Sequence, residues 1–431
     1  MVMNKVKLNQ KASVDFQTPE DVSFKFGYYN YNPISADGTK LLAHKINFEG
    51  RLPRENDIVE IGFFDLKTSI WIPLQTSKAF NWQQCSMLQW LGPDFNDRII
   101  FNDYEEGKFI SRIINVHTKE SKTICKAIYA VHPSGEYSIS LNFERCSFTR
   151  AYSYAPKVDD YWKDISPEED VIIKVDLQNN TFKKIINLDR VIKSSKLPIE
   201  SSKHWFEHIM FNNNGSRFAF YHRYETERGF VTKCLTANSD GSEIWNLPLS
   251  DTELISHLGW SNDEDFVVYT RLQSKFNSLW VGKPNRKIKD NLVRKVYRLL
   301  IKPIIPEFVK KKVIPTNTSY YLSVKDKKER MGKIEVSPKG MDGHPSFSNS
   351  GNYMLTDTYA DLNNERHLLL HDLVNKKTIK IGSFFSHYNN CNWRADLHPR
   401  FNSEENKIII DLNLDGNTQI MVINLESFNL N

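Results

Sequence analysis

The sequence has little cysteine and no long apolar run. Its cysteines number five, an odd and scattered set without a Cys-x-x-Cys pair. Such a set is typical of reduced thiols and does not support a disulfide framework, a zinc finger or a redox centre. No apolar run approaches the length of a membrane-spanning helix, and the N-terminus lacks the apolar core of a secretory signal. We therefore expect a cytoplasmic protein.

Several well-known functional motifs are also missing. The sequence contains no glycine-rich phosphate loop, Gly-x-Ser-x-Gly elbow, His-Glu-x-x-His zinc motif or EF-hand loop. These absences argue against nucleotide-dependent and serine-hydrolase chemistry. There is no nucleic-acid-binding motif, and the net charge of +5 does not indicate one. Residues 283–333 alone hold sixteen Lys/Arg and four Asp/Glu, a net +12, so the rest of the chain carries −7 and we expect no nucleic-acid partner.

Short β-branched runs separated by polar turns are abundant. Near the C-terminus, residues 408–412 (IIIDL) and 419–425 (QIMVINL) flank the turn Asp415-Gly416-Asn417. Runs of this kind predict antiparallel strands joined by hairpins. One such unit cannot bury both its faces, so it should recur along the chain.

The unit does recur, and we count seven copies. Each has an aromatic residue or proline, a polar turn, a strand, a variable loop and a second strand that often ends near Asp-Leu. The copies begin near residues 32, 88, 132, 210, 257, 344 and 396. This pattern predicts an all-β, seven-bladed β-propeller. A large β-sandwich would explain the strands but not the regularly spaced turns.

The predicted propeller is one domain over residues 21–431, preceded by a polar extension at residues 1–20. Residues 22–29 alternate as a strand, and we expect this strand to pair with the final blade and close the ring. Residues 143–170 are unusually aromatic for a solvated loop, so we expect them to fold over one face of the ring.

A basic insertion is predicted at residues 283–333. Within it, residues 288–302 place apolar side chains at helical spacing and Arg/Lys on the opposite face. Such a helix either packs its apolar stripe on a blade or docks on an anionic surface. The second alternative would give a peripheral contact with the inner membrane through residues 288–312.

Histidines stand at the openings of several predicted blades: His132, His257, His344 and His398. Asp396 and His398 lie on one side of an extended strand, and His344 comes from the preceding blade. Two imidazoles and a carboxylate form a suitable ligand set for Mn²⁺, Zn²⁺ or Ca²⁺. The alternative is that each His-Pro simply starts a blade and its imidazole packs locally.

Residues 204–224 are the richest in titratable and aromatic side chains. His208 and His222 are predicted on adjacent strands, where they would be an acid and a base that work near neutral pH. Arg223 and Arg145 are candidates for binding a substrate carboxylate. The alternative is a set of hydrogen-bonded histidines that brace the blades, with the arginines on the rim.

Four further residues are candidates for substrate contact. Trp82 offers a platform for a sugar ring, and Gln83 and Gln84 could bind its hydroxyls. Tyr154, in the aromatic insertion, is the fourth. The alternative for Trp82 is a place in the core between blades, which we expect for Trp90.

Six segments of the chain together resemble a known family. They read FGYYN, NWQQCSMLQW, HPSGEYSISLNF, HWFEHIMFNNNG, DGHPSFSNSGNYMLTDTY and ADLHPRFNSEENKIIID. Over nearly the whole chain they are similar to propeller lyases of the oligogalacturonate lyase and ulvan lyase type, with TolB-like blades. The resemblance implies β-elimination at uronic acid residues and a metal held by histidines of the late blades. His344 and His398 match those positions and Asp396 stands where a further ligand is expected, whereas the family's glutamine ligand has no clear match.

We therefore expect a lyase of an acidic, uronate-containing glycan. His208 would be the base, His222 the acid, and Arg223 with Arg145 or the metal would neutralise the substrate carboxylate. The alternative is a non-catalytic glycan-binding or scaffold protein of surface-polysaccharide biosynthesis, held at the inner membrane by the basic helix.

Overall fold

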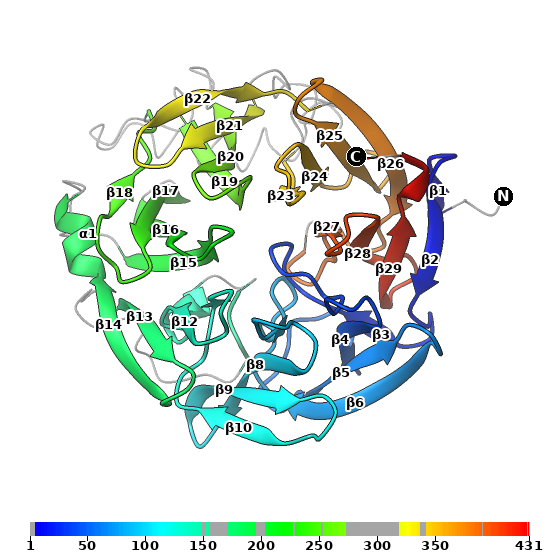
Figure 1. Cartoon of the computed structure of the whole chain (residues 1–431), viewed down its shortest axis with the longest axis horizontal. Coiled ribbons are helices and arrows are strands. Elements are labelled where there is room, and N and C mark those ends of the chain that lie inside the picture. Colours follow the sequence, from blue (N-terminus) through cyan, green and yellow to red (C-terminus); the bar gives the residue numbers. More distant parts are fainter. Residues whose placement is uncertain are drawn as a thin grey trace, which may run out of the picture.

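The strands of the computed structural model form seven separate antiparallel sheets, arranged as a ring around a central axis (Figure 1). This confirms the predicted seven-bladed β-propeller. The structure describes residues 5–148, 152–155, 170–194, 203–226, 229–250, 253–272, 319–336, 342–389, 391–428 and 430. Within these residues, no helix is both long enough and apolar enough to cross a membrane.

The first four blades follow one another along the chain. Blade 1 contains β3 (Ser23–Lys25), β4 (Lys40–Ile46), β5 (Val59–Asp65) and β6 (Ile70–Ser77). Blade 2 contains β7 (Gln89–Trp90), β8 (Arg98–Glu105), β9 (Lys108–Asn115) and β10 (Ser121–Ile124). Blade 3 contains β11 (Ala130–Val131), β12 (Tyr137–Ser140), β13 (Val171–Asp176) and β14 (Thr181–Asn187), followed by the helix α1 (Leu188–Ser194). Blade 4 contains β15 (His204–Phe211), β16 (Arg217–Thr226), β17 (Gly229–Asn238) and β18 (Trp245–Asn246).

The last three blades complete the ring. Blade 5 contains β19 (Glu253–Trp260), β20 (Asp265–Leu272), β21 (Ser319–Lys325) and β22 (Glu329–Ile334). Blade 6 contains β23 (Ser346–Phe347), β24 (Tyr353–Asp357), β25 (Glu365–Asp372) and β26 (Lys377–Phe385). Blade 7 contains β27 (Arg400–Phe401), β28 (Lys407–Asn413) and β29 (Thr418–Asn424).

Burial explains the sequence pattern of the blades. The middle strands are covered on both faces by neighbouring blades, so they read as continuous apolar runs, as in β28 and β29. The outer strands β6 and β22 face water and are largely polar or exposed. Trp90 is buried and its indole donates to the Pro33 carbonyl of blade 1 at 2.9 Å, which confirms its predicted place between blades.

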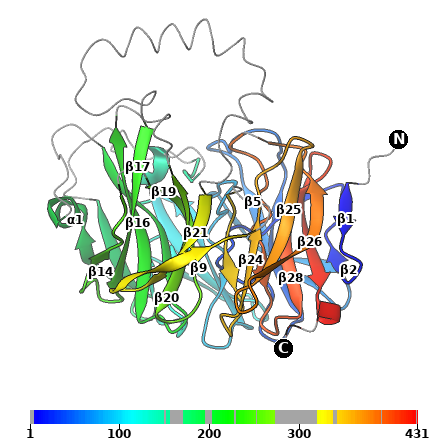
Figure 2. The same cartoon turned by 90° about the horizontal axis from the view of Figure 1, so that it is seen from above.

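Two N-terminal strands add to the last two blades, and one of them closes the ring. The strand β2 (Ser13–Gln17) pairs with β29 of blade 7, and β1 (Val6–Leu8) pairs with β26 of blade 6 (Figures 1 and 2). An N-terminal strand therefore completes the last blade, as predicted. The prediction that residues 22–29 form this strand is wrong. That segment supplies β3 of blade 1, and the supposed polar extension at residues 1–20 contains the closing strands. Edge strands that face water need few apolar residues, which is why the sequence pattern concealed them.

The predicted basic insertion is shorter than residues 283–333. Its last part forms β21 and β22, which complete blade 5. The predicted helix at residues 288–302 and the membrane-contacting segment at residues 288–312 lie outside the described residues.

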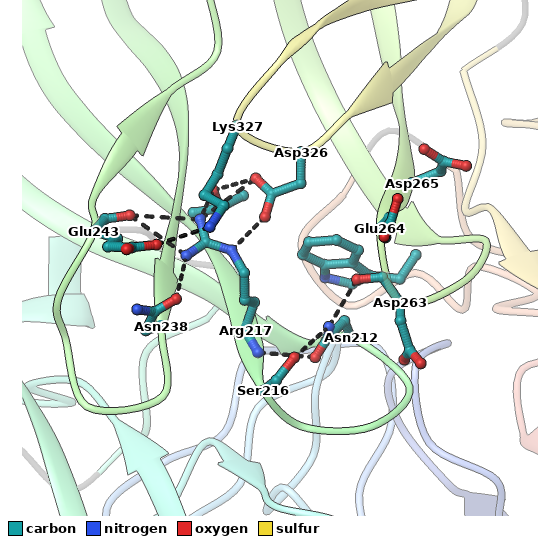
Figure 3. Close-up of polar contacts among 12 residues, drawn as sticks. Asn212, Ser216, Arg217, Asn238, Glu243, Asp263, Glu264, Asp265, Asp326 and Lys327 are labelled. Carbon is teal, nitrogen blue, oxygen red and sulfur yellow. Dashed lines mark hydrogen bonds and ion pairs between the residues drawn. The ribbon is translucent and has the colours of Figure 1, made fainter.

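A buried polar network joins blade 4 to blade 5 (Figure 3). Arg217 of β16 pairs with Asp326, which follows β21, and its Nη1 donates to Asn238 Oδ1 at 2.7 Å. The Thr236 hydroxyl donates to Asp326 Oδ1 at 2.5 Å. The Arg217 and Asp326 side chains are 8% and 4% exposed, so the pair is shielded from solvent.

Replacing only one partner of this pair should be costly. Arg217→Met leaves the Asp326 carboxylate buried without its cation and should lower the free energy of unfolding by about 3–5 kcal/mol. The double variant Arg217→Met/Asp326→Leu removes both charges and should recover at least half of that loss. Urea denaturation measures both values. A double variant as unstable as the single one would show that the uncompensated charge is not the cause.

Candidate functional site

A segment of blade 1 enters the central channel. The chain pairs with β4 at β3 and again at the bridge between Ile34 and Leu41, and residues 26–33 between these points leave the sheet. Asp411 of β28 accepts the backbone N–H of Phe26 at 3.0 Å and that of Gly27 at 3.3 Å. This segment is the blue loop that reaches the middle of the ring in Figure 1. We call residues 26–33 the channel segment.

The backbone of the channel segment is held tightly. Arg400, which is paired with Asp411, donates from Nε to the Tyr28 carbonyl at 3.0 Å and from Nη2 to the Gly27 carbonyl. Gly27 has a φ of +137°, and a Cβ at this position would lie 3.1 Å from the Gln84 carbonyl oxygen. Only glycine therefore fits, and the turn at Gly27 directs the next two aromatic rings into the channel.

Tyr28 and Tyr29 bring together imidazoles from four consecutive blades. The ring of Tyr28 lies 5.5 Å from that of His208 and 5.2 Å from that of His398, between centroids. The ring of Tyr29 lies 5.1 Å from that of His344 and 6.2 Å from that of His257. His208, His344 and His398 therefore meet around these two rings, and the predicted grouping of His344 with His398 is present in the structure.

The remaining blade-opening histidine, His132, lies elsewhere. Its ring stacks on Tyr137 with centroids 4.4 Å apart, and its Nδ1 bonds to the Ser134 hydroxyl at 2.8 Å. His132 thus follows the local-packing alternative.

Three of the four channel histidines have a hydrogen-bond acceptor at Nδ1, and the fourth, His208, has a carboxylate nearby. For His344 the acceptor is the Asp357 carboxylate at 2.8 Å, and for His398 the Gly27 carbonyl, also at 2.8 Å. A carbonyl only accepts, so Nδ1 of His398 carries the proton and its Nε2 has a free lone pair. That Nε2 is buried and has no hydrogen-bond partner among the residues that the structure describes. For His257 the acceptor is Asp342 at 3.0 Å, whereas His208 Nδ1 lies 3.2 Å from Glu207 Oε2 without a hydrogen bond to it.

Three of the clustered residues could hold a metal ion. His344, Asp396 and His398 each offer a donor atom, and these atoms lie within 4.8 Å of one another. All three are buried, and within the described part of the chain neither His398 Nε2 nor Asp396 Oδ2 has a hydrogen bond. A histidine that binds a metal through Nε2 commonly donates its Nδ1–H to a carboxylate or a carbonyl, as His344 and His398 do. The residues present fit a divalent transition metal.

Two arginines flank the carboxylate of this set. Arg366 Nη1 lies 2.7 Å from Asp396 Oδ1, and Arg394 donates from Nε to the same oxygen at 3.1 Å. Burial alone would raise the pKa of Asp396, but the two guanidinium groups outweigh it and hold this pKa well below its usual range. Asp396 is therefore ionised at neutral pH.

His208 belongs to a carboxylate-oriented dyad. Glu207 accepts the Trp205 indole N–H at 2.7 Å and pairs with Arg223. A bulge in β15 between Glu207 and Met210, with φ of +56° at His208, lets two adjacent side chains face the same region. Burial lowers the pKa of His208 to about 4, so its imidazole is neutral near pH 7.

His222 does not join His208. It pairs with Phe206 across the sheet, whereas Glu207 pairs with Tyr221, so His222 and Glu207 point to opposite faces of blade 4. His222 Nε2 bonds instead to His204 Nδ1 at 2.9 Å, and burial lowers its pKa to about 3. The expected His208–His222 acid–base pair is not formed, because a strand alternates its faces and the bulge changes the register.

The two predicted carboxylate-binding arginines differ in position. Arg145 is fully buried, donates from Nη2 to the His204 carbonyl at 2.8 Å and pairs with Asp170 at 3.1 Å. Arg145 therefore ties the loop after β12 to blade 4, and the structure does not present it to a substrate. We call the four channel histidines and the two tyrosines between them the channel cluster. Arg223 lies beside this cluster, because it is paired with Glu207, the neighbour of His208.

The predicted sugar-contacting side chains are interior. Trp82 packs against Phe48 and Phe80, and its indole donates to the Arg51 carbonyl at 2.7 Å. Gln84 donates to the Tyr129 hydroxyl at 2.6 Å, and Tyr154 accepts from Asn102 at 2.9 Å. All of these side chains are buried, which contradicts the proposed sugar platform. Gln83 alone touches the site, through the Arg394 carbonyl at 3.3 Å.

Partly exposed side chains surround the buried histidines. Tyr152, Asp342, Tyr359 and Arg394 are each of intermediate exposure. Tyr152 packs edge-on to His208 with centroids 4.9 Å apart, and its carbonyl accepts from Asn81 at 3.2 Å. Tyr152 of the aromatic insertion thus lies beside the channel histidines, whereas most of residues 143–170 lie outside the described residues. We call these four residues the mouth.

Sequence reasoning did not assign Tyr28, Asp357 or Arg394 to the site. For Tyr28 the clearest local signal of a place in the site is the Gly-Tyr-Tyr run directly after a strand. Asp357, at the end of β24, carries no comparable local signal, because its role depends on a bond to a distant residue.

No family model and no curated protein matches this sequence. Among solved structures, the chain is similar to an oligogalacturonate lyase in complex with manganese, at 15% identity and a TM-score of 0.61, over 96% of this chain and 93% of that one. It is also similar to an oligogalacturonate lyase from Vibrio parahaemolyticus, at 12% identity and a TM-score of 0.63, over 98% and 97%. The propeller domain of the Trilobed protease from Pyrococcus furiosus matches at 10% identity and a TM-score of 0.50, over 92% and 95%. At these identities the likeness establishes the fold.

Buried neutral histidines should make the protein sensitive to acid. The pKa of His44, His204 and His208 is lowered to about 4 and that of His222 to about 3, chiefly by burial. Between about pH 6.5 and pH 4 these histidines are protonated in the unfolded chain but stay neutral in the folded protein. The contribution of these histidines to the free energy of unfolding is therefore fully present above pH 6.5. As the pH falls below that value, each such histidine lowers the free energy of unfolding by about 1.4 kcal/mol per pH unit.

In His222→Gln the free energy of unfolding should fall less steeply between pH 6.5 and pH 4. The variant lacks one histidine that is protonated only in the unfolded chain. Urea denaturation at stepped pH measures the slope. His117→Gln, at an exposed position, is the matched control and should keep the wild-type slope. Equal slopes for His222→Gln and wild type would contradict the assignment of His222 as a buried neutral group.

Proposed function

We propose that this propeller is a lyase that cleaves an acidic, uronate-containing oligosaccharide by β-elimination. The observation that carries the proposal is the convergence of the Glu207–His208 dyad with His344, Asp396 and His398 around Tyr28. The similarity in fold to two oligogalacturonate lyases over nearly the whole chain supports this choice over other propeller functions.

The reaction requires three contributions. The substrate carboxylate must be neutralised, which acidifies the proton at the adjacent C5. A base must then remove that proton as the C4–O4 bond breaks and a C4=C5 double bond forms. The departing O4 finally takes up a proton.

His208 is the base in this proposal. Its Nδ1 faces the Glu207 carboxylate, so Nε2 is the nitrogen available to a substrate. With a pKa of about 4 it is unprotonated at neutral pH and ready to accept a proton. Arg223 is paired with Glu207, and in this proposal its guanidinium stabilises the negative charge that develops on the substrate.

His344, Asp396 and His398 would hold a divalent metal, of which Mn²⁺ and Zn²⁺ suit two imidazoles and a carboxylate best. When bound, such an ion supplies positive charge to the substrate carboxylate. The manganese of the similar oligogalacturonate lyase supports the inclusion of a metal. Cytoplasmic location and the absence of nucleic-acid binding stay predictions.

A second candidate function is non-catalytic glycan binding in surface-polysaccharide biosynthesis. The concentration of charge in residues 283–333, +12 from sixteen basic and four acidic residues, favours it. In this alternative the segment at residues 288–312 contacts the anionic surface of the inner membrane. Flotation with anionic liposomes, compared with a chain lacking residues 283–318, tests this contact.

The base is tested by product formation. Wild type should release unsaturated uronate, seen by the ultraviolet absorbance of the new C4=C5 bond, from at least one member of a panel of oligouronates. His208→Ala should lower kcat by about 10²–10⁴-fold, because it removes the base. His132→Ala, a histidine outside the channel cluster, should be as active as wild type. A wild type that is inactive on every oligouronate, or an unimpaired His208→Ala, would refute the proposal.

Metal content tests the ligand set. After chelation and reconstitution with Mn²⁺, elemental analysis should find about one ion per wild-type chain. His398→Gln should lose most of it, since Nε2 is an essential donor. His132→Gln is the matched control, because His132 also precedes a proline at a blade opening. Equal metal content in His398→Gln and wild type would exclude this ligand set.

A further inference from the structure

Four arginines lie close to the channel cluster, and three of them are enclosed. The side chains of Arg223, Arg366 and Arg400 are 10%, 2% and 2% exposed, and each is paired with a buried carboxylate. The Arg394 side chain is 21% exposed. Among the described arginines of the cluster, Arg394 therefore has the greatest access to a ligand at the mouth.

The contacts of Arg394 leave part of its guanidinium available. Nε donates to Asp396 Oδ1 at 3.1 Å and Nη1 to the Cys391 carbonyl at 3.1 Å. Nη2 lies 3.1 Å from Asp396 Oδ2, an oxygen that receives no hydrogen bond. A guanidinium has five N–H groups, so donors remain for a ligand.

The surroundings of Arg394 favour an anionic ligand. Asp396 is shared with Arg366, so the three side chains together carry one excess positive charge. The nearby carboxylates of Asp342 and Asp357 are each bonded to a histidine. The Tyr359 ring supports the guanidinium, whose carbon lies 5.2 Å from the ring centroid.

We infer that Arg394 is the residue that recognises the substrate's carboxylate and so selects uronates over neutral sugars and esters. A planar guanidinium matches a carboxylate through two parallel hydrogen bonds, which an ester cannot accept with the same charge assistance. This inference rests on the proposed function and deepens it, because it assigns the choice of substrate class to one side chain at the mouth. Arg366, on the buried side of Asp396, keeps the carboxylate in place.

The test compares the binding of digalacturonate and of its dimethyl ester by calorimetry. Wild type should bind the acid at least about tenfold more tightly than the ester. Arg394→Gln should reduce this preference to less than about threefold, with little change in affinity for the ester. Arg112→Gln is the matched control, since Arg112 is 17% exposed and paired with Asp103 on blade 2. It should keep the wild-type preference.

Arg394→Lys guards against loss of folding, because it retains a cation beside Asp396. This variant should melt close to wild type and show a preference between those of wild type and Arg394→Gln. A full preference for the acid in both Arg394 variants would overturn the inference while the proposed function stands. A wild type that binds neither compound and forms no unsaturated product from any oligouronate of the panel would overturn the proposed function, and the inference with it.

Discussion

The site depends on the grip of Asp411 and Arg400 on the channel segment. Asp411 accepts the N–H groups of Phe26 and Gly27, and Arg400 donates to the carbonyls of Gly27 and Tyr28. These contacts are buried, and a buried hydrogen bond to a charged group contributes more to stability than one between neutral groups. They bend the first strand of blade 1 away from its sheet and direct Tyr28 and Tyr29 into the channel. Without that bend the imidazoles of blades 4 to 7 would have no common packing surface.

A propeller suits such a site because its first strands converge on one axis. Four consecutive blades each contribute one histidine, and the orienting groups come from three carboxylates and one backbone carbonyl. Burial makes the channel electrostatics strong: it keeps His208 neutral, while two arginines keep Asp396 ionised. A neutral base, a free imidazole nitrogen and a negative ligand thus coexist within one small region.

The sequence predicted the seven blades and the grouping of His344, Asp396 and His398, because repeated turns and blade-opening positions are local signals. It failed where the outcome depended on burial or register. Trp82 and Tyr154 have side chains that serve a core or a sugar site equally well, and only packing decides between them. The separation of His222 from His208 follows from one bulge in β15, which no local pattern announced. The closing strand β2 was missed because an edge strand in contact with water needs little apolar sequence.

The central claim is that His344 and His398 turn their Nε2 atoms to one metal while His208 faces the substrate. Diffraction at the manganese edge, from crystals soaked with Mn²⁺ and a uronate disaccharide, tests it directly. The account predicts a single anomalous peak at about 2.0–2.3 Å from both Nε2 atoms, with C5 of the sugar towards His208. Imidazoles turned into separate environments, or a peak remote from His344 and His398, would contradict it.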